Sequence, residues 1–252
     1  MARAGWRVRV AVRRPNEALF VKPYGVPGQV EPVFCNIRDD DSVRAGMRGA
    51  DAVVNCVGTF DRGGRNNFQA VHVDGAGRIA RIAAEEGVAS LVHISALGAA
   101  SDSPSLYGQS KAEGEAAVLA AYPSAVILRP SVIFGTEDGF FNRFAGMSRM
   151  GPILPIVHGA TRFQPVFVDD VAQAAAKAAM GEAAPGIYEL GGPEAKSFRD
   201  WMTDMLAVIQ RRRLVLGLPV FAMRILAGAL DLGSLLTGRL ISNRILTRDQ
   251  LA

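Results

Sequence analysis

Short apolar runs alternate with helical segments from Trp6 to Gly135, and this alternation constrains the fold more than any other feature of the chain. The runs that predict strands span residues 6–12, 30–35, 50–58, 90–95 and 125–135. The segments that predict helices span residues 41–48, with Asp41 or Ser42 as the N-cap, residues 68–86, and a stretch that begins at Tyr107. Strands that alternate with helices in this way form a parallel, doubly wound sheet. The sequence therefore predicts an α/β domain.

Length and composition allow a second, smaller part of the chain. With 252 residues, 49% of them hydrophobic, the chain can bury a large core and an additional lobe. We predict the α/β domain over residues 1–135, with a return strand near residues 185–192, and a small, mostly helical lobe over residues 136–252. Phenylalanines and methionines at helical spacing in residues 140–150 favour a lobe core over a substrate pocket. Later helices are predicted over residues 171–180 and 197–210, the second capped by Ser197.

The strand that ends at Ser95 and the helix that begins at Tyr107 carry the candidate catalytic residues. Tyr107 and Lys111 are four residues apart, so they lie on the same face of the helix. A neighbouring ammonium favours the phenolate and lowers the pKa of a tyrosine, whose ordinary value is about 10. Ser95, at the carboxyl end of a parallel strand, is placed to donate a hydrogen bond to the same oxygen that Tyr107 protonates. The alternative is a lysine stem that packs on an aromatic ring at the helix surface.

The phosphate-binding part of such a domain is missing from its usual place. In a doubly wound sheet, a glycine-rich turn after the first strand holds the pyrophosphate at the N-terminus of the first helix. The first apolar strand here ends in Arg13-Arg14-Pro15 instead. Gly75 and Gly77 match the spacing of such a turn, but they lie inside the predicted helix 68–86, which favours a packing role. We therefore expect this strand to be the second of the sheet, and the first strand with its glycine turn to lie upstream of Met1.

Two arginines stand where the strand 6–12 ends, and they bear on the choice of dinucleotide. An acidic side chain at this point binds the ribose 2′-hydroxyl of NAD, whereas an arginine suits the 2′-phosphate of NADP. Arg13 and Arg14 therefore favour NADP as the cofactor, with NAD as the alternative. Surface arginines at the end of a strand are common, so a role unrelated to a cofactor stays open.

Taken in order, these features resemble the extended and atypical short-chain dehydrogenase/reductase family over roughly Trp6 to Asp200. The motifs that carry the resemblance are a serine that closes a strand, Tyr-x-x-x-Lys on the next helix, and Arg-Pro at the end of the following strand. They stand at Ser95, at Tyr107 with Lys111, and at Arg129 with Pro130. Two later family motifs correspond to Val168-Asp169-Asp170-Val171-Ala172 and to the stretch from Gly186 to Gly192. The resemblance implies a Rossmann-type fold.

The resemblance also implies contacts to NAD(P) along the carboxyl ends of the strands. The residues that match the family's cofactor positions are Arg13, Arg14, Asn36, Ile37, Asn55, Val57, Gly58, Tyr107, Lys111 and Pro130. Two positions depart from the family pattern. Asn36 replaces an adenine-side aspartate, and His72 stands where many active members have an asparagine in a proton relay. His72 can relay protons itself, but we favour a core or interface histidine.

Finer features are similar to one branch of that family, the nucleotide-binding accessory subunits of respiratory complex I (NADH:quinone oxidoreductase) and their bacterial relatives. The stretches that carry this similarity are Val12 to Pro15, Phe20 to Tyr24, Gln29 to Pro32, Asn36 to Arg38, Val71 to Ala80, His93 to Gly98, Asp138 to Phe144 and Thr161 to Pro165. In that branch the resemblance implies a bound NADP(H) that helps to hold the subunit together without turnover.

The C-terminal segment carries the excess positive charge. Residues 196–252 contain nine Lys or Arg and four Asp or Glu, a local +5 in a chain of net charge +4. Residues 220–246 are strongly apolar, but charged residues and glycines interrupt them before any run reaches the roughly 18 apolar residues of a spanning helix. This pattern favours a peripheral contact with a membrane surface or a membrane protein. The alternative is a helix that closes the core of the lobe.

Two hypotheses of function follow, and a third is weaker. The first is an accessory or assembly subunit of NADH:quinone oxidoreductase that carries a structural NADP(H) and contacts membrane-bound NADH dehydrogenase subunits, peripherally on the cytoplasmic side of the inner membrane. The second is an active NADP-dependent reductase or epimerase, soluble in the cytoplasm, that uses Ser95, Tyr107 and Lys111. The third is a regulator that senses the NADP(H) ratio. None of them involves nucleic acid. None involves a metal either, since Cys35 and Cys56 show no metal-ligand spacing.

Overall fold

The computed structural model describes residues 1–219, and within them the chain forms two compact units. The first unit contains Met1–Pro130 and Asp169–Leu190. The second contains Ser131–Val168 and the described residues from Gly191 on. This division differs from our predicted boundary at residue 135 in two elements. Strand β6 (Ile133–Phe134) belongs to the second unit, and all but the first residue of helix α5 (Val168–Ala179) belongs to the first.

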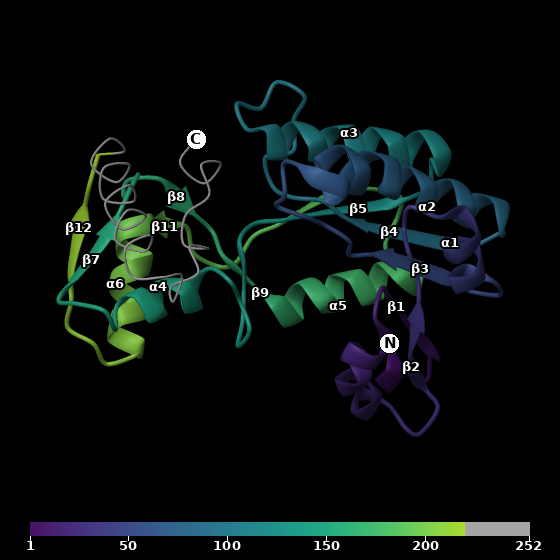
Figure 1. The fold of residues 1–252 in the computed structure, drawn as a ribbon, viewed down its shortest axis with the longest axis horizontal. Coiled ribbons are helices and arrows are strands. Elements are labelled where there is room, and N and C mark those ends of the chain that lie inside the picture. The colour runs from purple at the N-terminus through teal and green to yellow at the C-terminus, as the bar shows by residue number, and fades with distance from the viewer. Residues whose placement is uncertain (220–252) are drawn as a thin grey trace. The chain divides into compact units, whose positions relative to one another are not determined.

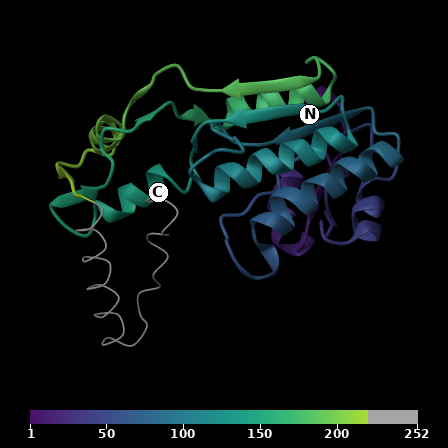
Figure 2. The ribbon, with the colours of Figure 1, turned by 90° about the horizontal axis from the view of Figure 1, so that it is seen from above.

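A four-stranded parallel sheet forms the centre of the first unit (Figures 1 and 2). Its strand order is β10-β5-β4-β3, with β3 at Ala52–Asn55, β4 at Ser90–Ile94, β5 at Val126–Pro130 and β10 at Gly186–Leu190. The register places Asn55 beside His93 and Ile94 beside Leu128, so the carboxyl ends of the strands meet at one edge. The predicted parallel, doubly wound α/β fold is therefore confirmed.

Helices cover both faces of this sheet (Figure 1). One face carries α1 (Asp40–Met47), α2 (Asp74–Glu85) and α3 (Leu106–Ala121), and the other carries α5. Successive side chains of a strand point to opposite faces. Leu91 of β4 therefore packs into the cluster with α2 and α3, while its neighbour Val92 packs against α5. Both are fully buried, which explains why strands of this sheet are apolar on both faces.

A separate two-stranded parallel sheet precedes these elements. It pairs β1 (Val8–Val12) with β2 (Val30–Phe34), and the 3₁₀ segment η2 (Pro15–Tyr24) connects the two strands. Within residues 1–219, β1 pairs only with β2 and β3 pairs only with β4. These two strands therefore have no neighbour in common within the described residues.

Contacts between α1 and α2 attach this two-stranded sheet to the rest of the unit. Asp40 accepts a hydrogen bond from Arg78 at 2.6 Å, and Arg44 pairs with Glu86 at 2.7 Å. These ion pairs are half-exposed and contribute about 1 kcal/mol or less each. The apolar cluster beneath them, which includes Val43 of α1, supplies the larger part of the attachment.

Three local predictions need correction. The N-cap of α1 is Asp39, whose carboxylate accepts from the Asp41 backbone N–H, rather than Asp41 or Ser42. The predicted helix 68–86 begins as a π-helix, η4 (Gln69–Val73), before α2 follows. The predicted strand 125–135 stops at Pro130, and its last part forms β6 (Ile133–Phe134), which pairs with β9 (Val166–Phe167) in the second unit. Two further 3₁₀ segments are η1 (Ala2–Ala4) and η3 (Gly64–Asn66).

The described part of the second unit packs two helices and short strand pairs around an aromatic core. The helices are α4 (Phe141–Met147) and α6 (Phe198–Val208). The strand pairs are β7 (Ile153–Ile156) with β12 (Leu214–Gly217), and β8 (Arg162–Phe163) with β11 (Lys196–Ser197). Phe140 and Phe144 pack there on Phe198, which confirms the prediction that the aromatic stripe is a lobe core. The predicted cap Ser197 is also confirmed.

The predicted apolar segment 220–246 lies outside the described residues. Across residues 1–219, none of the helices combines the length and the apolar character that crossing a membrane requires.

Candidate functional site

The carboxyl ends of β3, β4 and β5 and the first turns of α3 bring the candidate catalytic residues together. Ser95 follows β4 directly, and α3 begins at Leu106, so Tyr107 and Lys111 lie in its first two turns. Helix α3 packs closely against the π-helix η4, since a side chain at Gly114 would overlap the backbone carbonyl of His72. The carboxyl end of the buried strand β4 therefore lies close to the start of α3, as the sequence predicts.

Lys111 is buried and bonds to the backbone rather than to Tyr107. Its Nζ donates to the carbonyl oxygen of Ile94 at 2.9 Å. Burial lowers the pKa of the Lys111 ammonium to about 8, while the charge of Glu115 opposes that change. Burial also raises the pKa of the Tyr107 phenol. Our expectation of a lowered phenol pKa is therefore wrong, because burial raises it in this structure.

Ser95 donates its hydroxyl hydrogen to a carboxylate that no sequence motif marks. The acceptor is Glu115 Oε1, on the same face of α3 as Lys111 and four residues beyond it. Arg129 of β5 holds the same carboxylate with two bonds, from Nε at 2.9 Å and from Nη2 at 2.6 Å. Ser95 and Glu115 are both only 4% exposed. A hydroxyl has one hydrogen to donate, so the hydroxyl of Ser95 is not available as a donor to a ligand in this arrangement.

His72 is a core histidine with both ring nitrogens engaged. Its Nε2 accepts from the backbone N–H of Thr59 at 3.0 Å, which leaves the hydrogen on Nδ1. That hydrogen points to Ser110 Oγ at 2.9 Å, and Ser110 donates in turn to the carbonyl of Tyr107 at 2.8 Å. Burial lowers the pKa of His72 to about 4. The arrangement supports our interpretation of His72 as a structural residue rather than a proton relay.

Aromatic rings cover the side chain of Tyr107. Phe60, which follows β3 by five residues, stacks on the phenol with ring centroids 5.2 Å apart and an angle of 20° between the planes. Phe68 meets the same phenol edge-on at 6.0 Å, and His72 does so at 5.5 Å. Phe60 itself is 72% exposed, so it forms the outer layer of this stack. Nothing in the local sequence marks Phe60 as a neighbour of Tyr107, since the two rings meet only through the fold.

The predicted cofactor residues of the β1–β2 sheet differ in how free they are. Arg13 is exposed immediately after β1, whereas Arg14 pairs with Glu17 at 2.9 Å. The side chain of Asn36 accepts from the backbone N–H of Arg38, and Ile37 packs against α2. Arg13 is therefore the cation best placed for a phosphate at this strand end.

The predicted residues of the four-stranded sheet surround the strand ends near Tyr107. The amide of Asn55 spans β3 and β4, since its oxygen accepts from Val57 N–H at 3.1 Å and its nitrogen lies 3.0 Å from Nδ1 of His93. Burial lowers the pKa of His93 to about 3, so this ring is neutral. Val57 and Gly58 are exposed at the loop, and Pro130 is buried with its carbonyl bonded to the N–H of Leu97. Asn55 and Pro130 are thus bonded within the edge of the sheet, whereas Val57 and Gly58 are accessible at its surface.

These residues fit the two ends of a dinucleotide but not its centre. In a sheet of this plan, we expect Arg13 to meet the adenosine end of the dinucleotide and the loop from Val57, together with Tyr107, to meet the nicotinamide end. Within the described residues, the turn after β1 has no glycine. Gly75 and Gly77, which match the spacing of such a turn, are packing residues. A Cβ on Gly75 would lie 2.8 Å from Ile37, and one on Gly77 would lie 3.3 Å from Ala117. NAD(P) would therefore be held here by its ends.

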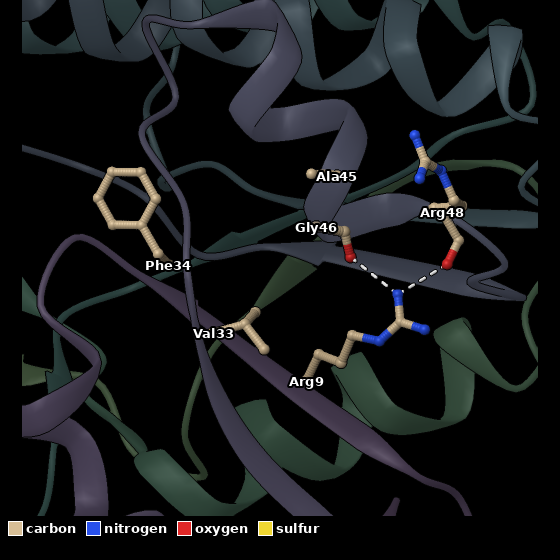
Figure 3. Close-up of a pocket in the computed structure, with 6 residues that line it drawn as sticks. All are labelled: Arg9, Val33, Phe34, Ala45, Gly46 and Arg48. Atoms are coloured by element: carbon tan, nitrogen blue, oxygen red, sulfur yellow. Dashed lines mark hydrogen bonds between the residues drawn. The ribbon is translucent and has the colours of Figure 1, made fainter.

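A hollow of about 400 Å³ lies elsewhere in the unit, between β1, β2 and α1 (Figure 3). Its lining residues are Arg9, Val33, Phe34, Ala45, Gly46 and Arg48. The guanidinium of Arg9 donates to the carbonyls of Gly46 at 3.2 Å and of Arg48 at 2.7 Å, at the end of α1. Arg9 lies near the start of β1, whereas ligands of parallel sheets bind beyond the carboxyl ends. This hollow is therefore separate from the candidate site.

Comparisons with known proteins agree with this geometry. A family model described as NAD(P)H-binding matches residues 1–130, and a model of the RmlD substrate binding domain matches residues 99–214. The mitochondrial "NADH dehydrogenase [ubiquinone] 1 alpha subcomplex subunit 9" of Arabidopsis thaliana is 36% identical over 77% of this chain and 50% of its own length. The "Ceramide reductase" of Caulobacter vibrioides is 33% identical over 68% of this chain and 53% of its own length. The chain thus spans about half the length of these relatives.

Solved structures show the same fold. The dTDP-4-dehydrorhamnose reductase of Bacillus anthracis, solved in complex with NADP, has a TM-score of 0.68 and an identity of 16% over 85% of each chain. The match at this identity concerns the fold alone. The NAD(P)H-binding model covers more than half of the 252 residues, and the same family plan is seen in the sheet, the Tyr107–Lys111 pair and the return strand. The protein therefore belongs to the NAD(P)H-binding family of extended short-chain dehydrogenase/reductase type.

Proposed function

We propose that this protein is a non-catalytic accessory subunit of a proton-pumping NADH:quinone oxidoreductase and carries NADP(H) as a structural cofactor. The observation that carries the proposal is the hydrogen bond from Ser95 to Glu115. Reduction of a carbonyl needs a donor that stabilises the charge developing on its oxygen. Ser95 is the candidate for that task, and its hydrogen is committed to a carboxylate that Arg129 also holds.

The surroundings of Tyr107 support the same conclusion. A catalytic tyrosine needs a pKa near the working pH. Burial moves the pKa of Tyr107 in the opposite direction, and the ring of Phe60 covers one face of the phenol. The names of relatives such as the Arabidopsis thaliana protein supply the context of NADH dehydrogenase.

The cofactor and the partners follow from the same reasoning. The exposed Arg13 favours NADP over NAD, because a guanidinium can bind a 2′-phosphate with two bonds. The partners are membrane-bound NADH dehydrogenase subunits, with residues 196–252 as a basic contact to the membrane surface. The protein would then sit peripherally on the cytoplasmic side of the inner membrane.

Purification of the tagged full-length chain from native membrane extract tests this proposal. We expect NADH dehydrogenase subunits to be recovered with it, and equally well with the Tyr107→Phe variant, because assembly does not need the phenol hydroxyl. Recovery of a soluble monomer that oxidises NADPH with a carbonyl compound would contradict the proposal.

A second candidate function is an active NADP-dependent reductase or epimerase. The retained Tyr107 and Lys111 favour it, and one relative is named a ceramide reductase. Under this alternative, turnover of NADPH with a carbonyl substrate is lost in Tyr107→Phe. The Tyr24→Phe variant is the matched control, since Tyr24 is an exposed tyrosine of the same unit.

A further inference from the structure

Four large apolar side chains are exposed within eight consecutive residues of the connection between β1 and β2. They are Leu19 (50% exposed), Phe20 (68%), Tyr24 (70%) and Val26 (67%), and we call them the N-terminal apolar patch. Pro15 opens the segment and Pro23 lies within it, so its backbone is restricted. Single exposed apolar residues are ordinary, but a cluster of this kind marks an interaction surface.

The last part of this segment lies at the amino end of the two-stranded sheet. The turn from Val26 to Gln29 leads into the start of β2. Gln29 ties this turn to the residues before β1, since its Nε2 donates to the carbonyls of Ala2 at 2.6 Å and of Trp6 at 3.1 Å. Arg13 lies at the opposite, carboxyl end of β1. A partner at this end of the patch would therefore leave Arg13 uncovered.

Positive charge surrounds the patch. Residues 1–31 contain six Lys or Arg and two Asp or Glu, a net +4 that equals the net charge of the whole chain. Arg9 and Arg14 already have partners in the carbonyls after α1 and in Glu17. Arg3, Arg7 and Lys22 are exposed, and the described part of the chain offers them no ion pair. The uncompensated charge calls for an anionic partner.

We infer that the N-terminal apolar patch docks on an anionic phospholipid surface. Aromatic side chains such as Phe20 and Tyr24 favour the boundary between headgroups and acyl chains. Lys22 stands between them in sequence, and cations near the surface attract anionic headgroups. The two terms act together: the cations concentrate the protein at the surface, and the apolar groups insert. This inference does not depend on the proposed function, because it needs neither complex I nor residues 220–252.

Flotation of the full-length protein with lipid vesicles tests the inference. The vesicles are phosphatidylcholine alone or phosphatidylcholine with phosphatidylglycerol. We expect binding to the anionic vesicles and a loss of about tenfold in the partition coefficient for Phe20→Ser/Tyr24→Ser, since burial of the two rings is removed. Arg7→Glu/Lys22→Glu should lose tenfold or more, and only on anionic vesicles. Met150→Ser/Val208→Ser is the matched control, because these side chains are 73% and 81% exposed but lie in the second unit, and it should bind like the wild type.

Two results would overturn the inference. Wild-type protein that stays unbound on anionic vesicles shows that the surface does not recognise lipid. Patch variants that bind as tightly as the wild type show that the contact lies elsewhere in the chain. If the patch variants keep vesicle binding but are no longer recovered with NADH dehydrogenase subunits, the patch is a protein contact and the lipid assignment is wrong. Substitutions at exposed positions change stability little, and an unchanged thermal midpoint of each variant checks that lost binding is not unfolding.

Discussion

Removal of the Glu115 carboxylate is the most direct test of the site geometry. In the folded protein this group accepts from Ser95 and from two nitrogens of Arg129, and it is 4% exposed. In Glu115→Ala the guanidinium loses both charged bonds while its side chain stays 21% exposed. Lys111 loses the charge that offsets its burial. Two buried or half-buried cations would then remain without a counter-charge.

The loss of unfolding free energy in Glu115→Ala depends on the charges that remain after the carboxylate is removed. Breaking a buried ion pair by removal of one partner costs about 3–5 kcal/mol, because the remaining charge is desolvated and unpaired. The half-exposed position of Arg129 allows some water to reach it, which favours the lower end, about 3 kcal/mol. The lost bond from Ser95 adds about 1 kcal/mol. We therefore expect Glu115→Ala to lose roughly 3–4 kcal/mol of unfolding free energy.

Urea denaturation at neutral pH measures this loss, and Arg129 supplies its own matched control. The same guanidinium lies 3.8 Å from Glu189, whose side chain is 61% exposed. Glu189→Ala should cost less than about 1 kcal/mol, because exposed pairs are screened by solvent. The two variants remove the same functional group from the same partner, so only burial and bond number differ between them.

Equal losses in Glu115→Ala and Glu189→Ala would refute the reasoning. The double variant Glu115→Leu/Arg129→Met provides a second check. Replacement of both charged groups with apolar side chains of similar size removes the unpaired guanidinium, while Lys111 keeps its bond to the carbonyl of Ile94, so most of the lost stability should return. A double variant as unstable as Glu115→Ala would show that the side-chain volume of Glu115, and not its charge, is what the fold needs.

Two further predictions concern the buried histidines and the cofactor. Burial holds the pKa of His72 at about 4 and of His93 at about 3, below the ordinary value of 6.5. As the pH falls, the histidines of the unfolded chain therefore take up protons before those of the folded protein do. The stability that the two neutral rings contribute is present above pH 6.5 and is lost as the pH falls toward 4. Denaturation between pH 7 and 4 should show this loss, about 3 kcal/mol or less for each ring, and a smaller one in His72→Asn; an unchanged pH profile in that variant would contradict the assignment. Arg13→Ala should weaken NADPH binding about tenfold and leave NADH binding unchanged in calorimetric titrations, with Arg7→Ala as the matched control at the other end of β1; equal losses for both dinucleotides would rule out a 2′-phosphate contact.

The elements of the first unit follow from the sequence because their signals are local. A strand such as β4 is an apolar run of five residues, and α3 is a long stretch of helix formers, so period and propensity identify both. The N-cap of α1 is different, because Asp39, Asp40, Asp41 and Ser42 can all cap a helix. The chain direction at the end of β2 decides among them, and local sequence does not encode that direction.

The candidate site is predictable in its residues but not in its contacts. The spacing of Tyr107 and Lys111 places them on one face, and the strand end places Ser95 opposite. The partner of Ser95 is twenty residues away on α3, and the ion pair of that partner reaches a third element, β5. Such contacts depend on how three elements pack. The position of Glu115 four residues after Lys111 is the one local signal that could have drawn attention to it.

The retention of Lys111 is compatible with a protein that does not turn over. Its ammonium bonds to the carbonyl of Ile94, the last residue of β4, and its charge interacts with that of Glu115. A buried carbonyl without a donor costs about 1–3 kcal/mol, so a lysine at this position stabilises the strand end with or without a substrate. The Tyr-x-x-x-Lys spacing therefore identifies the fold more firmly than it identifies catalysis. What separates the two is the third residue on that face of α3: a carboxylate at Glu115 captures Ser95 and completes a structural network among α3, β4 and β5.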